Sequence, residues 1–286
     1  MPLNTACVGR EYPPVTINVT LDALQKYARA YNDDNPAFFD AKRPTGIIAP
    51  PMFGVTVTWD ALMKAMMDPD LHVDLLRLVH GEQDMEFPNP IRPGDVITAN
   101  AKIVSIEAKT TGETMTVELN AANQKGQPVQ KTLFIIFIRG ARNRDAGSSE
   151  PRPIEPARGE PLFSVAQTID LDQTFRYAEA SGDPNPIHVD ENVAKMAGLP
   201  GIIVHGLCTM AFTSKIAIDK LCVGDPLRLK RLRVRFSRPV LPGQTITTKF
   251  WADNESDRDG RKVFAYETFN PDGQPVIKGG IAEVAP

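Results

Sequence analysis

The sequence is poor in the residues that mark several protein classes. It has three cysteines among 286 residues, Cys7, Cys208 and Cys222, and no CxxC pair. Such a sparse, odd set argues against a disulfide scaffold and favours a reducing compartment. No apolar run is long enough to span a bilayer, and the start, MPLNTACVGREYPP, lacks the basic and apolar regions of a signal peptide. We therefore expect a cytoplasmic protein in which Cys208 and Cys222 are buried small side chains.

The chain also lacks an excess of charge of either sign. Its formal net charge is −3, with 23% charged residues. This balance gives no reason to expect a nucleic-acid partner or a membrane surface. With 42% hydrophobic residues, the chain has the composition of a globular protein, and its length suits one large or two ordinary domains.

An internal repeat decides between these two sizes. The stretch YARAYNDDNPAFFD begins at Tyr27, and the similar stretch YAEASGDPNPIHVD begins at Tyr177. Later landmarks recur in the same order, among them a Gly-Ile-Ile, a Phe-x-x-Pro followed by Pro-Gly, and a Gly-Gln-Pro-Val. The chain is therefore two copies of one domain. We place them at residues 1–140 and 163–286, joined by a linker at 141–162 that is rich in Gly, Pro, Ser and charge.

Each copy has the same predicted order of elements. A short amphipathic helix and a turn-rich loop precede a helix that is apolar on nearly all sides, Met52 to Met67 in the first copy and Gly206 to Cys222 in the second. Strands separated by turns follow, at 96–108, 114–124 and 130–140, and then at 229–240, 244–254, 262–273 and 276–284. This pattern predicts an α+β fold in which an antiparallel sheet wraps around one buried helix.

The second copy concentrates groups that can do chemistry. Asp183 precedes His188 by five positions in a loop, and Gly206 follows at the expected start of the apolar helix. A histidine titrates near neutrality and can take a proton, and a nearby carboxylate can orient the same water. Backbone N–H groups at a helix start are unpaired and lie at its positive end. An acid, a base and a free N–H in one stretch are typical of a catalytic site. With His205 as the one further histidine nearby and no HExxH, we expect no metal.

These motifs resemble those of the MaoC-like, or (R)-specific, enoyl-CoA hydratases of the hotdog fold. The resemblance rests on SGDPNPIH, on AGLPGIIVHGLCTMAF and on the following RVRFSRPVLPGQ. The whole chain resembles the double-hotdog members, which implies two tandem antiparallel sheets, each wrapped around a central helix. The resemblance also implies that Asp183 and His188 activate water, that the Gly206 N–H binds the thioester oxygen, and that Ser214 supports Asp183. Asn185 is a further supporting candidate, although Asn35 recurs at its place and favours a structural role.

The first copy departs from this pattern. Three site positions are replaced: His188 by Phe38, Gly206 by Pro51, which has no N–H, and Ser214 by Trp59. Asp33 alone survives, without a partner. We therefore expect one active site per chain, and we expect the first copy to provide a wall or tunnel for the acyl chain.

Structural interpretations compete with several of these roles. His188 could be a loop histidine bonded to backbone, Asp183 could simply bend the chain, and Ser214 could bond to its own helix. His205 could shape the turn before the helix rather than bind substrate. Three arginines, Arg231, Arg233 and Arg235, alternate with apolar residues on one face of a strand, where they either form a solvated outer face or attract the phosphates of coenzyme A.

The resemblance predicts a hydro-lyase that reversibly hydrates a trans-2-enoyl-CoA to a (3R)-3-hydroxyacyl-CoA. It needs no cofactor, because coenzyme A is part of the substrate, and the chain is a candidate homodimer. Close alternatives are a 3-hydroxyacyl-carrier-protein dehydratase and a hydratase of a branched or dicarboxylic enoyl-CoA. A hotdog thioesterase and a non-catalytic acyl-binding subunit are more distant alternatives.

Overall fold

The computed structural model describes residues 1–74, 77–140, 159–253 and 260–286 and confirms an α+β double hotdog. Each half of the described chain contributes five strands. In the first half these are β1 (Val15–Asn18), β2 (Leu78–Glu86), β3 (Val96–Lys109), β4 (Gly112–Ala122) and β5 (Pro128–Arg139). In the second half they are β6 (Phe163–Thr168), β7 (Leu229–Phe236), β8 (Thr245–Ala252), β9 (Lys262–Phe269) and β10 (Pro275–Val284).

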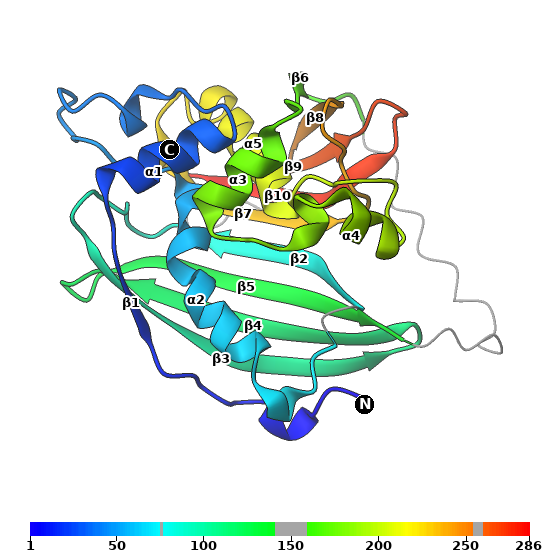
Figure 1. Ribbon diagram of the computed structural model, residues 1–286. Coiled ribbons are helices and arrows are strands. Elements are labelled where there is room, and N and C mark those ends of the chain that lie inside the picture. Colours follow the sequence, from blue (N-terminus) through cyan, green and yellow to red (C-terminus); the bar gives the residue numbers. More distant parts are fainter. Residues whose placement is uncertain (75–76, 141–158, 254–259) are drawn as a thin grey trace.

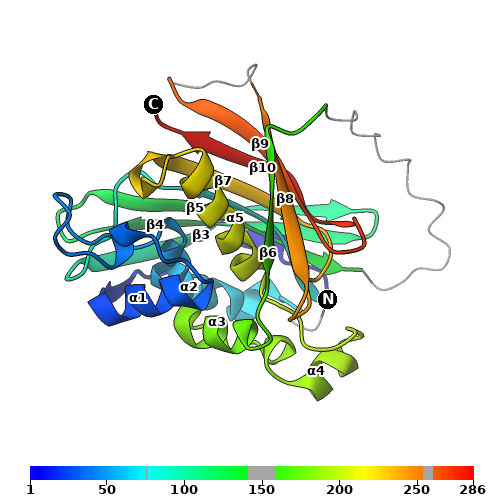
Figure 2. The same cartoon turned by 90° about the horizontal axis from the view of Figure 1, so that it is seen from above.

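The two halves share one continuous sheet rather than two separate ones. Its order is β1-β3-β4-β5-β2-β7-β10-β9-β8-β6, and every neighbouring pair is antiparallel (Figures 1 and 2). Equivalent strands of the two halves follow one another in the same order from either edge of the sheet, and the equivalent strands β2 and β7 pair at its centre. Without this pairing, β2 and β7 would each be an exposed edge strand of a five-stranded sheet. Their pairing covers both edges and joins the two sheets into one.

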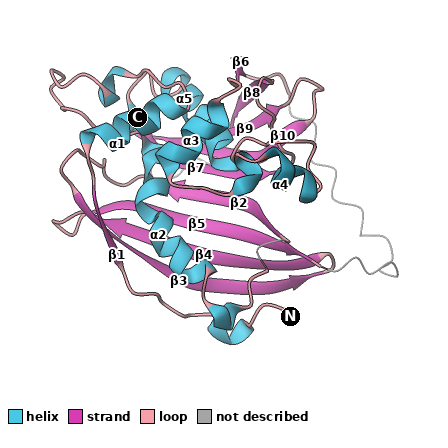
Figure 3. Cartoon of the chain, viewed as in Figure 1, coloured by secondary structure: helices cyan, strands magenta, loops and turns pink. Residues whose placement is uncertain are grey.

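A buried helix crosses the sheet in each half, as the apolar stretches predict. In the first half, α2 (Gly54–Met66) follows a 3-10 turn at Pro51–Phe53 and packs on β3 and β4, and in the second half α5 (Gly206–Lys220) packs on β7. The helices lie together on one side of the sheet (Figure 3). Most of the side chains of α5 are buried, which explains the lack of a polar face in its sequence.

The two halves also meet through their amphipathic helices, α1 (Leu21–Ala30) and α3 (Gln173–Ser181). Tyr27 and Tyr177, which open the two repeat stretches, are both fully buried there, and their hydroxyl oxygens lie 2.9 Å apart. Residues at equivalent positions of the repeat touch each other only at a two-fold axis. The chain therefore has the internal symmetry of a dimer.

The sequence patterns did not predict several of the observed elements. The short edge strands β1 and β6, the junction strand β2 and the helix α4 (Glu191–Met196) were not predicted, whereas the seven strands that were predicted are present within a few residues. β5 ends at Arg139 and β6 begins at Phe163, and most of the predicted linker lies outside the described residues.

Candidate active site

A series of turns brings Asp183 and His188 to the same place. Helix α3 ends at Ser181, and the next residue, Gly182, has a left-handed φ of 78° that reverses the chain. Asp183 Oδ1 then accepts the N–H of Asn185, and Asn185 Oδ1 accepts the N–H of Ile187 and caps the 3-10 turn Pro186–His188. Asn185 is itself exposed, so its observed contacts are those of a turn-forming residue.

His188 ends this turn as a buried side chain with a defined tautomer. Its Nδ1 lies 2.8 Å from the carbonyl oxygen of Ile203. A carbonyl can only accept, so Nδ1 carries the proton and Nε2 keeps its lone pair. Burial lowers the pKa of His188 below its ordinary value of 6.5, which holds the ring neutral. The ring is therefore prepared to act as a base through Nε2.

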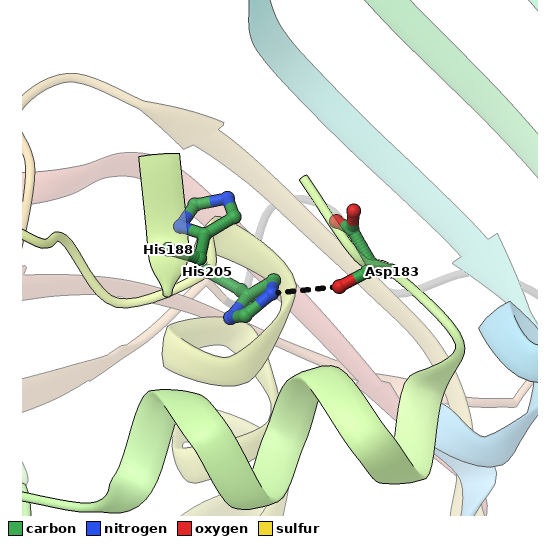
Figure 4. Close-up of side chains that lie close together, drawn as sticks. All are labelled: Asp183, His188 and His205. Atoms are coloured by element: carbon green, nitrogen blue, oxygen red, sulfur yellow. Dashed lines mark hydrogen bonds between the residues drawn. The ribbon is translucent and has the colours of Figure 1, made fainter. Parts of the chain in front are cut away.

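His205 supports this arrangement from the position before α5. Its ring stacks on that of His188 with 3.7 Å between centroids, and its Nε2 donates to the carbonyl oxygen of Asp183 over 3.3 Å (Figure 4). Its Nδ1 is 3.2 Å from the hydroxyl of Thr174. Burial, together with His188, lowers the pKa of His205 to about 2. Because both ring nitrogens have protein partners, the geometry favours the turn-shaping interpretation over substrate binding.

Asp183 completes the group, and its carboxylate is the most accessible member. Burial raises the pKa of Asp183, an effect that the neighbouring His188 opposes. One ligand atom from each of Asp183, His188 and His205 lies within 4.8 Å of the others, which is close enough for a metal ion. However, the bonds described above leave only His188 Nε2 and the carboxylate free, whereas catalytic zinc takes three protein ligands. The donor set therefore does not fit zinc, and the prediction of a metal-free site stands as a prediction.

Gly206 starts α5, as expected, directly after His205. Among the described residues, its N–H has no hydrogen-bond acceptor. A Cβ at this position would lie 3.1 to 3.3 Å from three ring atoms of Phe236, so a side chain here would press on that ring. The glycine thus leaves an open N–H at the positive end of a buried helix, which is the arrangement of an oxyanion site.

The predicted support of Asp183 by Ser214 is not observed. Ser214 is fully buried on α5, and its Oγ has no hydrogen-bond partner within the described ranges. The backbone N–H of Asn185 holds the Asp183 carboxylate instead. The neighbouring Lys215 forms ion pairs with Asp33 and Asp34 of the first half, so this turn of α5 contributes to the contact between the halves.

The first half keeps the turn but changes its chemistry. Asp33 is buried and its Oδ1 accepts the N–H of Asn35, as in the second half. The ring of Phe38 occupies the place of His188 at the end of an equivalent 3-10 turn. Phe38 leaves Asp33 without a histidine partner, and Lys215 Nζ of the second half lies 3.7 Å from Asp33 Oδ1. Asp33 therefore has an ammonium group nearby, whereas Asp183 has an imidazole.

The three arginines of β7 lie on the sheet face opposite α5. Arg231 binds Asp84 through two nitrogens at 2.7 and 2.6 Å and also binds Glu283, while Arg233 binds Glu82 at 2.9 Å. The acids Asp84 and Glu82 belong to β2, so these pairs connect the two halves. The predicted attraction for coenzyme A phosphates does not fit Arg231 and Arg233, whose charges are already neutralised. Arg235 is exposed and has no ion-pair partner in the described part of the chain.

Comparison with known proteins identifies the family. The model of the MaoC like domain matches residues 154–270, and that of the FAS1-like dehydratase domain region matches residues 6–132. The chain is 32% identical to the probable enoyl-CoA hydratase 2 of Dictyostelium discoideum, over 87% of this chain and 82% of the other. It is 30% identical to peroxisomal multifunctional enzyme type 2 of Drosophila melanogaster over 88% of its length, but it spans only 41% of that longer protein.

Solved structures agree with this assignment. The crystal structure of a MaoC-like dehydratase from Phytophthora capsici has a TM-score of 0.84 and 26% identity, over 99% of this chain and 98% of the other. None of the described helices is long and apolar enough to cross a membrane. This chain belongs to the MaoC-like hydratase/dehydratase family, in its double-hotdog form.

Proposed function

We propose that this protein reversibly hydrates a trans-2-enoyl-CoA to a (3R)-3-hydroxyacyl-CoA. Hydro-lyase chemistry follows from the family, while the substrate, the stereochemistry and the residue roles are the proposal. The observation that carries it is the pair of Asp183 and His188, whose Nε2 is free, together with the unpaired N–H of Gly206, the residue directly after the His205 that stacks on His188.

The reaction places one demand on each of these groups. His188 Nε2 accepts a proton from water as the water oxygen forms its bond to C3. The C2–C3 π electrons move toward the thioester, and the Gly206 N–H stabilises the negative charge on its oxygen. Electrons then return to C2, which takes up the proton that the Asp183–His188 pair received from water. Asp183 orients the water, and its raised pKa suits it to share in this last transfer.

The carrier and the acyl group belong to the same proposal. Relatives with enoyl-CoA hydratase in their names support coenzyme A, whereas a relative from Mycobacterium tuberculosis is named 3-hydroxyacyl-thioester dehydratase Y, which leaves the carrier open. We assign to the first half the role of enclosing the acyl chain, because Phe38 is buried and Pro51 lines an apolar recess there. A homodimer and a cytoplasmic location stay predictions, and several relatives carry peroxisomal names.

Loss of the conjugated thioester absorbance tests the proposal, with crotonyl-CoA and longer enoyl-CoA substrates. We expect wild-type activity and a decrease of about 10²–10⁴ in rate for Asp183→Asn and for His188→Gln. Asp33→Asn, the equivalent change in the first half, is the matched control and keeps its activity. Full activity in both second-half variants would sink the site assignment. A thiol reagent run in parallel detects free coenzyme A, which a thioesterase releases and a hydratase does not.

A further inference from the structure

His80, in the first half, has no part in the site described so far. It lies on β2 beside a bulge: His80 pairs with Ile136 and Glu82 pairs with Ile135, so Gly81 has no opposite residue. The extra residue turns His80 onto the same face as Gln83, whose Oε1 lies 3.1 Å from the His80 Nε2. Without the bulge, His80 would share the outer face with Glu82.

The bulge directs His80 toward the catalytic half. Its ring stacks on Phe134 at 4.0 Å and contacts Phe236 at 4.8 Å between centroids. Phe236 is the ring that packs against Gly206. A first-half histidine therefore lies one side chain away from the unpaired N–H of the second-half site. Among the described residues, no hydrogen bond or ring contact joins His80 or Phe236 to the Asp183–His188 pair.

The repeat supplies an internal comparison. The spacing that relates Phe87 to Phe236 relates His80 to Leu229, and β7 has the same bulge there, since Arg231 pairs with Glu283 and Leu229 with Val284. Leu229 lines the recess of the first half together with Pro51 and Phe87. The histidine thus faces the half that keeps the catalytic groups, and a leucine faces the half that has lost them.

The tautomer and charge of the His80 ring determine which hydrogen bond it can form with a substrate. Its Nε2 lies 3.2 Å from the carbonyl oxygen of Glu82, so Nε2 carries the proton and Nδ1 holds a lone pair. No described residue donates to Nδ1. Burial lowers the pKa of His80 to about 4, so the ring is a neutral acceptor at ordinary pH.

We infer that His80 positions the substrate by accepting a hydrogen bond from the pantetheine amide nearest the thioester sulfur. This inference rests on the proposed function. A thioester whose oxygen lies at Gly206 has two arms, and the Asp183–His188 pair acts on the arm that contains C2 and C3. We place the sulfur arm on the other side of the carbonyl carbon, toward Phe236 and His80, because Phe236 packs against Gly206 and contacts His80. The amide N–H is the first donor along that arm.

Two small substrates test this inference. One is the crotonyl thioester of N-acetylcysteamine, which carries the amide N–H; the other is its 2-acetoxyethyl analogue, in which an ester oxygen replaces that N–H. We expect the wild type to prefer the amide about two- to tenfold in kcat/KM, the range of a neutral hydrogen bond. His80→Phe keeps an aromatic ring against Phe134 and Phe236, and we expect it to bring the ratio to about one.

The ratio separates positioning from packing. A variant that only disturbs Phe236 lowers both rates together and keeps the wild-type ratio, and this outcome overturns the inference. His80→Leu, which copies Leu229, is the second variant if His80→Phe folds poorly, as judged by thermal unfolding. A wild type that hydrates neither thioester nor crotonyl-CoA would refute the proposed function itself. Hydration of both thioesters without preference would refute only the role of His80.

Discussion

Asp183 and Asp33 occupy equivalent turns but differ in their electrostatic surroundings. Each carboxylate accepts the N–H of the asparagine two residues later. Burial raises the pKa of both. The group opposite them differs: Asp183 faces an imidazole that can be neutral or charged, whereas Asp33 faces the ammonium of Lys215. In the proposed mechanism only the first arrangement can pass a proton near neutral pH, so the partner rather than the aspartate would decide which half activates water.

The pH dependence of the reaction follows from His188. Burial lowers its pKa below 6.5, and the base must be neutral to accept a proton from water. We expect kcat/KM to stay level as the pH falls to 6.5 and to decrease only at lower pH, with an apparent pKa that belongs to the Asp183–His188 pair. Initial rates in buffers of constant ionic strength from pH 4 to 9 would measure this. An acid limb above pH 7 would contradict the assignment of a buried neutral histidine.

The lowered pKa of His188 also makes the stability of the folded protein depend on pH. The unfolded chain binds a proton at His188 at higher pH than the folded chain does. The contribution of His188 is therefore fully present above pH 6.5 and is lost as the pH falls through its folded pKa. We expect His188→Gln to reduce the decrease in the free energy of unfolding between pH 7 and 5, measured by urea denaturation. An unchanged slope would show that other groups dominate this range.

The N–H of Gly206 can be tested without changing any side chain that titrates. Gly206→Pro copies Pro51 and removes the donor, and we expect a decrease of about 10²–10³ in kcat. Gly206→Ala is the matched control, because it also adds a Cβ against Phe236 but keeps the N–H. The difference between the two variants isolates the donor. Equal losses would instead assign the effect to the displaced ring.

At the scale of elements, β2 and β7 do more than complete the sheet. On its outer face, β2 presents acids and β7 presents arginines, and the observed pairs cross from one half to the other. The strands are equivalent in the repeat, and opposite charges at equivalent positions make the outer faces of β2 and β7 electrostatically complementary to each other. Local periodicity predicted that the arginines share a face, but their partners lie on a strand far away in the sequence.

Replacing Arg231 tests this junction. Its side chain is 18% exposed, and Asp84 and Glu283 are 14% and 5% exposed. Arg231→Met leaves the mostly buried Asp84 carboxylate without its cation and leaves Glu283 with Arg261 alone. We expect a loss of about 3 kcal/mol in the free energy of unfolding, by chemical denaturation. Arg235→Met is the control on the same strand and should change stability little. A raised KM for enoyl-CoA in Arg231→Met at full stability would restore the coenzyme A interpretation.

The predicted elements differ from the unpredicted ones in whether their own residues show a regular hydrophobic pattern. The helix from Gly206 and the long strands carry a pattern within their own residues. In contrast, β2 contains a bulge that breaks the alternation at Gly81, and β1 and β6 are only a few residues long. At the site, the Asp183–His188 spacing and the helix start were readable from the chain. The stacking of His205 on His188 and the reach of Lys215 to Asp33 depend on the folded arrangement, which no local pattern encodes.

At the scale of the whole molecule, duplication lets one chain have two different halves around one axis. A symmetric dimer must carry the same residue on both sides, so His80 and Leu229 could not differ, nor could His188 and Phe38. The covalent repeat removes this constraint while the axis contacts stay paired. Lys26 of α1 and Glu179 of α3 form an ion pair near that axis, beside the two buried tyrosines.

Replacing the two tyrosines tests whether the hydrogen bond between their hydroxyls links the two halves and stabilises the folded chain. In Tyr27→Phe or Tyr177→Phe, one fully buried hydroxyl remains without a partner, so each single change should cost about 1–3 kcal/mol of unfolding free energy. The double change removes both hydroxyls and leaves no unpaired group. We therefore expect the double variant to lose less than the sum of the two single variants, measured by urea denaturation at one pH. Additive losses would mean that each hydroxyl has another partner, such as a buried water, and that the two halves are not linked through this bond.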